Sequence, residues 1–345
     1  MHTSEAIEHR DHHSAKKILI AQPRGFCAGV DRAVRSVQMI LDNSARTEQQ
    51  TNPQELPPVY VRREIVHNRH VVEHFEQQGV VFVEALQDIP QAAAEAAIPV
   101  VFSAHGVSPE VRREALARQL YVVDATCPLV SKVHREVLRY AKLGYHIVYI
   151  AQQGHDEAIG VVGEAPDRIH LVESIEDVDA LHVSPGTKLV CLTQTTLSVD
   201  ETAELQRHLR KRFPAVEMPP SADICYATQD RQFAVKQLAE ASDAVIVIGS
   251  DHSSNTRQLL KVAQDVFDSK MDGIQRRAHR IDRAQELQQE WLRDAQIIGL
   301  SSGASAPESL IQEVIKVLEN NEFHTIEVIG AAEQHTQFAL PAPLR

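Results

Sequence analysis

Short apolar runs alternate with amphipathic stretches along most of the chain. The runs "ILIA" (18–21), "HIVYIA" (146–151) and "AVIVIG" (244–249) are rich in β-branched and aliphatic residues, which is typical of buried β-strands. Helical stretches of about 12 residues, with apolar positions every three or four residues, separate such runs. This alternation predicts parallel α/β architecture, in which helices cover both faces of each sheet.

A cysteine precedes an amphipathic helix at three places roughly 100 residues apart, which makes an internal repeat. The segments are "RGFCAGVDRAV" with Cys27, "DATCPLVSKVH" with Cys127 and "DICYATQDRQ" with Cys225. The repeat predicts three similar α/β domains arranged around a common centre. The expected divisions are a disordered His-rich leader at 1–16, domains at 17–126, 127–223 and 224–315, and a C-terminal segment at 316–345.

Polar residues follow two further apolar runs in each third of the chain. They are His67 and His105 in the first third, His155, Glu157, Thr195 and Thr196 in the second, and Ser253, Ser254, Asn255 and Ser305 in the third. Because ligands of parallel sheets bind outside the carboxyl ends of the strands, we expect these residues to surround one centre with the three cysteines.

Two alternatives stay open for these polar residues. The hydroxyl residues are also suited to helix caps and turns, and Ser198 and Ser305, each three residues before a glutamate, predict capping boxes. Asp156 and Glu157 are equally suited to a solvated loop.

Composition narrows the expected partners and compartment. Acidic residues outnumber basic ones by 47 to 35, so neither nucleic acid nor an anionic membrane is an expected partner. No apolar run approaches the roughly 20 residues that span a bilayer. The polar beginning of the chain lacks the apolar core of a secretory signal, and we therefore expect a cytoplasmic protein.

The cysteines favour a metal or redox centre over a disulfide framework, because four thiols are too few and too far apart for the latter. Cys191 lies inside the apolar run "KLVCLTQ" and is expected to be a buried structural thiol. Cys27, Cys127 and Cys225 lack the close pairing of a zinc knuckle. They suit a [4Fe–4S] cluster with three cysteine ligands and one open iron, and the alternative is three core thiols.

The remaining polar residues favour an anionic ligand. Helix N-termini, hydroxyls, imidazoles and an amide, without lysine or arginine, are suited to phosphate or diphosphate. Neither the GxGxxG nor the GxxxxGK[ST] fingerprint of nucleotide binding is present in the sequence. Glu157, beside His155, is a candidate proton donor.

Nine segments of the sequence, in this order, resemble the 4-hydroxy-3-methylbut-2-enyl diphosphate reductase (LytB) family. They are "PRGFCAGVDRAV", "EIVHNRHVV", "SAHGVSP", "DATCPLVSKVH", "GHDE", "LTQTTLSVDET", "DICYATQDRQ", "GSDHSSNTRQL" and "GASAPE". The resemblance spans about residues 17 to 315. It implies a trefoil of three α/β domains around a [4Fe–4S] cluster with one open iron.

The resemblance also assigns roles to residues. It implies cluster ligands at Cys27, Cys127 and Cys225, a threonine near the substrate hydroxyl at Thr195, and proton delivery by Glu157. The implied diphosphate pocket consists of His67, His105, His155, Ser253, Ser254, Asn255 and Ser305. The implied reaction is a two-electron reductive dehydration that yields isopentenyl and dimethylallyl diphosphate, with flavodoxin or ferredoxin as electron donor. It is the last step of the methylerythritol phosphate route to isoprenoids.

The chain departs from the compact form of the family in three places. These are the leader, an insertion around "NSARTEQQTNPQELPP" (43–58) and extra residues at "DSKMDGIQRRAHRIDRAQ" (268–285), which we expect to form surface loops. Two other functions remain to be separated from the reductase. One is a non-redox cluster enzyme of the quinolinate synthase kind, which acts on dicarboxylates, and the other is an iron–sulfur sensor without turnover.

Overall fold

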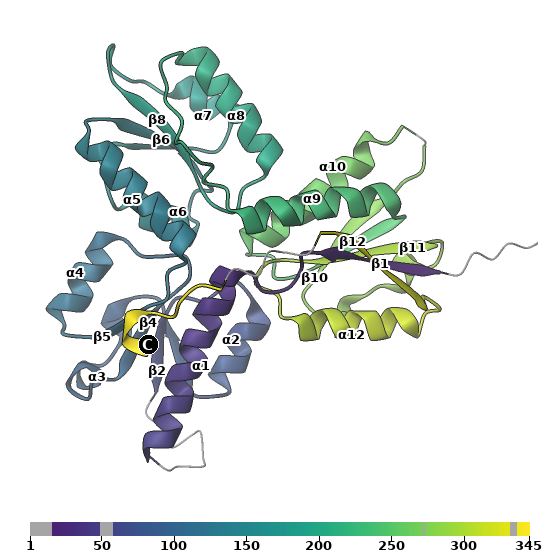
Figure 1. Ribbon diagram of the computed structural model, residues 1–345, viewed down its shortest axis with the longest axis horizontal. Coiled ribbons are helices and arrows are strands. Elements are labelled where there is room, and N and C mark those ends of the chain that lie inside the picture. Colours follow the sequence, from purple (N-terminus) through teal and green to yellow (C-terminus); the bar gives the residue numbers. More distant parts are fainter. Residues whose placement is uncertain (1–15, 49–57, 272, 332–336) are drawn as a thin grey trace, which may run out of the picture.

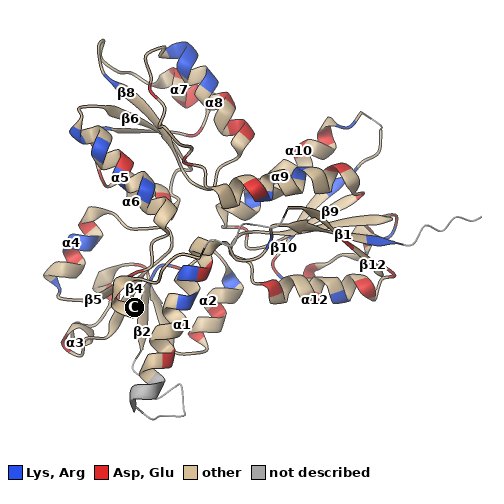
Figure 2. Cartoon of the chain, viewed as in Figure 1, with Lys and Arg blue, Asp and Glu red and all other residues tan. Residues whose placement is uncertain are grey.

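The computed structural model describes residues 16–48, 58–271, 273–331 and 337–345. Within these residues, three parallel sheets form three lobes around a common centre (Figure 1). Acidic and basic residues are interspersed along the outer helices of each lobe (Figure 2). The arrangement confirms the predicted fold class of three α/β units.

The first lobe has a four-stranded sheet in the order β3-β2-β4-β5. Its strands are β2 (Val59–Arg62), β3 (Val80–Val83), β4 (Pro99–Phe102) and β5 (Tyr121–Asp124). On one face pack α1 (Ala28–Glu48) and α2 (Arg69–Glu76), and on the other α3 (Gln91–Glu95) and α4 (Pro109–Ala117). Helices on both faces explain why these strands are apolar almost throughout.

The second lobe has a three-stranded sheet in the order β7-β6-β8. Its strands are β6 (His146–Ile150), β7 (Ile169–Val172) and β8 (Leu189–Thr193). One face is covered by α5 (Pro128–Lys142) and α6 (Asp156–Val162), and the other by α7 (Ile175–Ala180) and α8 (Val199–Arg212). Cys191 lies in β8 with no exposed surface, as expected of a structural thiol.

The third lobe has a five-stranded sheet in the order β10-β9-β11-β1-β12. Its strands are β1 (Lys17–Gln22), β9 (Ala244–Ile248), β10 (Arg277–Ile281), β11 (Ile297–Ser302) and β12 (Thr325–Gly330). One face packs on α9 (Tyr226–Ala241) and α10 (Ser254–Ser269), and the other on α11 (Gln289–Leu292) and α12 (Glu308–Glu319).

Strand pairing corrects the expected boundaries of the first and third domains. Residues 17–22, expected in the first domain, pair in parallel with β11 and β12 in the third sheet. β12 itself belongs to the segment expected to follow the third domain. Ile18 and Ile20 are buried in the core of the third sheet, so burial of apolar surface there outweighs proximity along the chain. The first lobe therefore begins with α1.

The described part of the two insertions also differs from the expected loops. Residues 268–285 contain the end of α10 and all of β10, an edge strand that pairs in parallel with β9. The strand is hard to see in the sequence because only Ile281 of "RAHRI" is fully buried. The first insertion begins within α1, which continues to Glu48. Residues 1–15 of the predicted leader (1–16) and residues 49–57 lie outside the described residues.

Candidate functional site

The three repeated cysteines occupy equivalent backbone positions at the centre of the molecule. The amide nitrogens of Cys27, Cys127 and Cys225 donate to the carbonyl oxygens of Ala304, Ala104 and Thr195, at 3.1, 2.9 and 3.1 Å. The carbonyl oxygen of each cysteine then accepts a hydrogen bond from the amide four residues later, as the first turn of a helix requires. Each cysteine thus joins the N-terminus of α1, α5 or α9 to a loop of another part of the site.

One cavity of about 100 Å³ lies where these three helices begin. Its lining includes every residue that was predicted to surround the common centre: Cys27, His67, His105, Cys127, His155, Glu157, Thr195, Thr196, Cys225, Ser253, Ser254, Asn255 and Ser305. Among the described residues that line it, none is lysine or arginine. The sequence therefore predicted where these side chains meet, although their roles stay predictions.

The three thiols lie close enough to influence one another. Burial raises the pKa of Cys127 to about 12, with a further contribution from Cys27, and burial raises that of Cys225 to about 11. A Cβ atom added to Gly29 would lie 2.5 Å from the Cys127 Sγ and 3.9 Å from the Cys27 Sγ, so a side chain at this position would displace the Cys127 thiol. A strongly positive group stabilises partly buried neighbouring cysteines as thiolates, so this donor set fits an iron–sulfur core or another thiophilic metal centre.

Glu157 is a buried carboxyl group held by Thr195. The Thr195 amide donates to Oε1 at 2.8 Å and the Thr195 hydroxyl to Oε2 at 2.7 Å. Glu157 is only 1% exposed, which excludes the alternative of a solvated loop acid. Burial raises the pKa of Glu157 to about 7, against the opposing effect of the two hydrogen bonds. This carboxyl therefore keeps a substantial proton occupancy near neutral pH.

Three histidines form a compact group beside the cavity. The rings of His67 and His105 stack with centroids 3.9 Å apart, and His155 lies edge-on at 5.1 Å from His67. Burial, reinforced by His67, lowers the pKa of His155 to about 3 and that of His105 well below its usual range. The Nδ1 atom of His155 accepts from the Glu157 amide at 3.1 Å, so the ring proton of neutral His155 lies on Nε2. His105 and His155 are thus neutral hydrogen-bond donors.

The hydroxyl residues divide between caps and other roles. Ser253 is the N-cap of α10, and Ser198 is the N-cap of α8, as the capping alternative predicted. Ser305 is not a cap, because α12 begins at Glu308 after Pro307. Its hydroxyl instead donates to the carbonyl oxygen of His67 at 2.9 Å.

Two further contacts leave donors free for a ligand. The Thr196 hydroxyl donates to Ser254 Oγ at 3.0 Å, so the proton of Ser254 remains available. The Oδ1 atom of Asn255 accepts from the Ala304 amide at 2.8 Å, whereas its Nδ2 is buried without a partner. A buried unpaired amide donor favours an acceptor in the adjoining cavity.

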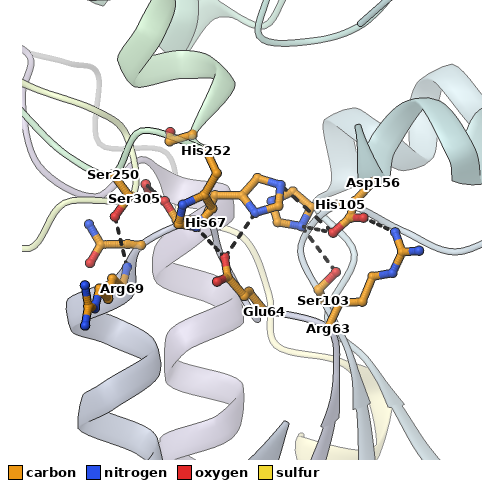
Figure 3. Close-up of polar contacts among 12 residues, drawn as sticks. Arg63, Glu64, His67, Arg69, Ser103, His105, Asp156, Ser250, His252 and Ser305 are labelled. Carbon is orange, nitrogen blue, oxygen red and sulfur yellow. Dashed lines mark hydrogen bonds and ion pairs between the residues drawn. The ribbon is translucent and has the colours of Figure 1, made fainter. Parts of the chain in front are cut away.

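A set of charged residues around His67 was missed from the sequence (Figure 3). Arg63 forms an ion pair with Asp156, whose Oδ2 lies 4.0 Å from His67 Nε2. Glu64 Oε2 lies 3.3 Å from His67 Nδ1 and 2.7 Å from His252 Nε2. The only sequence signal was proximity: Glu64 precedes His67 by three residues, and His252 directly precedes Ser253.

A comparison with protein-family models shows to which family the chain belongs. The family model described as "LytB protein" matches residues 18–319. The chain belongs to the LytB family. This membership confirms the family that the sequence motifs indicate.

Named relatives match the LytB chain over almost its whole length. A protein of Bifidobacterium longum (strain NCC 2705), named 4-hydroxy-3-methylbut-2-enyl diphosphate reductase, is 53% identical over 96% of this chain and 92% of its own. A protein of Nocardia farcinica (strain IFM 10152) with the same name is 46% identical over 97% and 93% of the two chains.

Solved structures agree with this affiliation. The E-1-hydroxy-2-methyl-but-2-enyl-4-diphosphate reductase of Plasmodium falciparum superposes with a TM-score of 0.86 at 37% identity, over 96% of this chain and 97% of that one. A second reductase, described as the terminal enzyme of the non-mevalonate pathway, has a TM-score of 0.57 at 29% identity, over 88% and 99% of the two chains. None of the described helices combines the length and hydropathy needed to cross a membrane.

Proposed function

We propose that this LytB chain reduces 4-hydroxy-3-methylbut-2-enyl diphosphate to isopentenyl and dimethylallyl diphosphate, the last step of the methylerythritol phosphate route. Family membership and the names of the relatives support the substrate and the reaction. The observation that carries the proposal is the buried Glu157 carboxyl in the same cavity as three converging thiols. Reductive removal of a hydroxyl group needs both a proton donor and an electron-transfer centre.

Cys27, Cys127 and Cys225 would hold a [4Fe–4S] cluster with three protein ligands and one open iron. Their equivalent positions at three helix N-termini oppose the effect of burial on Cys127 and Cys225, because the positive ends of the helix dipoles stabilise thiolates. When bound, such a cluster supplies electrons and a Lewis-acidic iron. Cys191 is excluded as a ligand because it is buried in the core of the second lobe.

Glu157 would act as the general acid. The allylic C–O bond breaks, two electrons enter the substrate, one proton leaves with the hydroxyl as water, and a second proton adds to carbon. Addition at either end of the allyl unit accounts for two isomeric products. Glu157 supplies the proton for water, and Thr195 holds the carboxyl through both of its oxygens.

The diphosphate would bind where the free donors gather. Ser253 Oγ accepts from the Thr256 amide at 3.3 Å and Ser254 Oγ accepts from Thr196, so both serine hydroxyls keep a proton to donate. Asn255 Nδ2 adds a buried unpaired donor. Further donors come from His67, His105 and His155, whereas Ser305 lines the cavity with its hydroxyl proton directed to the His67 carbonyl oxygen. Oriented neutral donors at helix N-termini are suited to a phosphate anion.

Absence of lysine and arginine from the described cavity lining disfavours the dicarboxylate-binding rival, because carboxylates are usually held by paired cationic donors. Electrons would come from a small redox protein such as flavodoxin or ferredoxin.

The deciding experiment is anaerobic purification followed by iron and sulfide analysis and a turnover assay. About four irons per chain, with oxidation of a reduced dye on addition of 4-hydroxy-3-methylbut-2-enyl diphosphate, is the expected result. A full iron count without oxidation would favour the non-redox enzyme or the sensor. Zinc, or no metal, would refute the proposed centre.

A further inference from the structure

Glu64 links two histidines of different lobes through one carboxylate oxygen. It lies between β2 and α2 of the first lobe, and its Oε2 contacts His67 Nδ1 at 3.3 Å and His252 Nε2 at 2.7 Å (Figure 3). His252 belongs to the loop between β9 and α10 of the third lobe. His67 lines the cavity, whereas Glu64 does not. Glu64 therefore contacts His67 from outside the cavity.

Glu64 is an acceptor at every pH at which the protein is expected to work. Burial alone would raise its pKa, but hydrogen bonds from His252 and His67 outweigh this effect and lower the pKa to about 2. The same contact raises the pKa of His252. An ionised carboxylate has no proton to donate, so both imidazoles must donate to it. The proton of His67 on this side is therefore on Nδ1.

This assignment fixes what the other nitrogen of His67 can do. A neutral imidazole carries one ring proton, so with Nδ1–H directed to Glu64 the Nε2 atom would hold a lone pair. A lone pair repels a phosphate oxygen. His67 becomes a donor at Nε2 only as an imidazolium, which would form an ion pair with the Glu64 carboxylate through Nδ1 at 3.3 Å. A charge-assisted hydrogen bond to a diphosphate is about twice as strong as a neutral one.

Among the described groups around His67, no other carboxylate is close enough to accept a hydrogen bond from its ring. The titratable groups that face this ring are Arg63, Glu64, His105, His155, Asp156 and His252. Asp156 Oδ2 lies 4.0 Å from His67 Nε2, beyond hydrogen-bond distance, and Asp156 is paired with Arg63. The other three are imidazoles and offer no negative charge.

We propose that Glu64 is a positioning residue for the substrate's diphosphate: it holds His67 by Nδ1–H and makes the ring a charged donor at Nε2. This inference rests on the proposed function, because it takes the diphosphate to bind beside His67. Glu64 itself touches no substrate. His252 provides the second hydrogen bond, which keeps the carboxylate directed toward the boundary of the first and third lobes.

The test is a double-mutant cycle in the iron-loaded protein, with binding of inorganic diphosphate measured by calorimetry. Glu64→Gln keeps the size of the side chain and a carbonyl acceptor for Nδ1–H but removes the charge. At pH 8 the dissociation constant should rise about tenfold, because the charge-assisted hydrogen bond from His67 to the diphosphate is lost. At pH 6, where an imidazole gains its second proton more readily, the rise should be less than about threefold.

The cycle is completed on the His67→Asn background. There Glu64→Gln should change the dissociation constant less than about twofold, because Glu64 acts through His67. Glu73→Gln is the matched control, since Glu73 also links the first and third lobes, through Arg283, without contacting His67. It should leave diphosphate binding unchanged.

Equal effects of Glu64→Gln in both backgrounds, or an effect that does not vary between pH 6 and pH 8, would overturn the inference. These outcomes are separable from failure of the proposed function. If the wild-type protein reduces the substrate and the cycle is additive, only the role of Glu64 is wrong. If the wild type binds diphosphate with the expected coupling but shows no turnover, the reductase assignment is wrong.

Discussion

Replacement of Glu157 by glutamine tests whether this carboxyl donates the proton for water. The pKa of Glu157 is about 7, so about half of the molecules hold the proton at pH 7. If the protonated form is required, kcat is constant at low pH and falls tenfold per pH unit above pH 7. Glutamine cannot donate a proton in this way, and kcat should fall by about 10²–10⁴-fold. The decline with rising pH should vanish in this variant.

The companion variant Thr195→Val tests the sign of the expected change in the pKa of Glu157. The Thr195 hydroxyl donates to Glu157 Oε2 and lowers the pKa of that carboxyl. Valine keeps the shape but removes this hydrogen bond, which contributes roughly 1.5–3 kcal/mol when the acceptor is charged. The pKa should rise by about one to two units, since each unit corresponds to about 1.36 kcal/mol. The decline in kcat should therefore move to higher pH.

The assay is anaerobic dye oxidation with saturating substrate between pH 6 and pH 9.5. Iron content of each variant serves as the control, because a lost cluster would lower kcat at every pH. Persistence of the alkaline decline in Glu157→Gln, or its movement to lower pH in Thr195→Val, would refute the assignment of Glu157 as the proton donor.

Three further predictions concern the metal centre and the anion pocket. Cys127→Ser should lose most of the iron while Cys191→Ala retains it, and equal iron contents would contradict the ligand assignment. Gly29→Ala should lower iron content, because its Cβ would lie 2.5 Å from the Cys127 Sγ; iron retention at the wild-type level would show that the thiol moves freely. Asn255→Ala should raise the KM for the substrate about tenfold or more, as loss of a donor to an anion costs roughly 1.5–3 kcal/mol, with kcat measured alongside to detect a change in chemistry.

Much of the site was predictable because it is built at strand and helix ends. Cys127 and His155, for example, each follow an apolar run, and parallel sheets collect such residues at one edge. The same logic predicted three α/β units. It failed for β1, since a strand can pair with any sheet that buries it, and neighbours in sequence do not decide which.

The charged residues around His67 were not predictable for a different reason. Glu64, Asp156 and His252 come from three lobes, and each looks like an ordinary surface residue in its own segment. Their contacts depend on how the lobes approach one another, which no local pattern records. Ser305 shows the same limit, because its spacing to Glu308 suits a capping box but its hydroxyl bonds to His67 of another lobe.

The placement of β1 between β11 and β12 bears on how the chain acquires its structure during synthesis. The second lobe draws all of its strands from 146–193, so its sheet can form soon after that stretch leaves the ribosome. The third sheet must wait, because its strand from the beginning of the chain joins partners at 297–302 and 325–330. Until then β1 lacks both neighbours. We therefore expect the proposed iron-binding centre, which would need Cys27 close behind β1, to be completed only when the polypeptide is almost fully made.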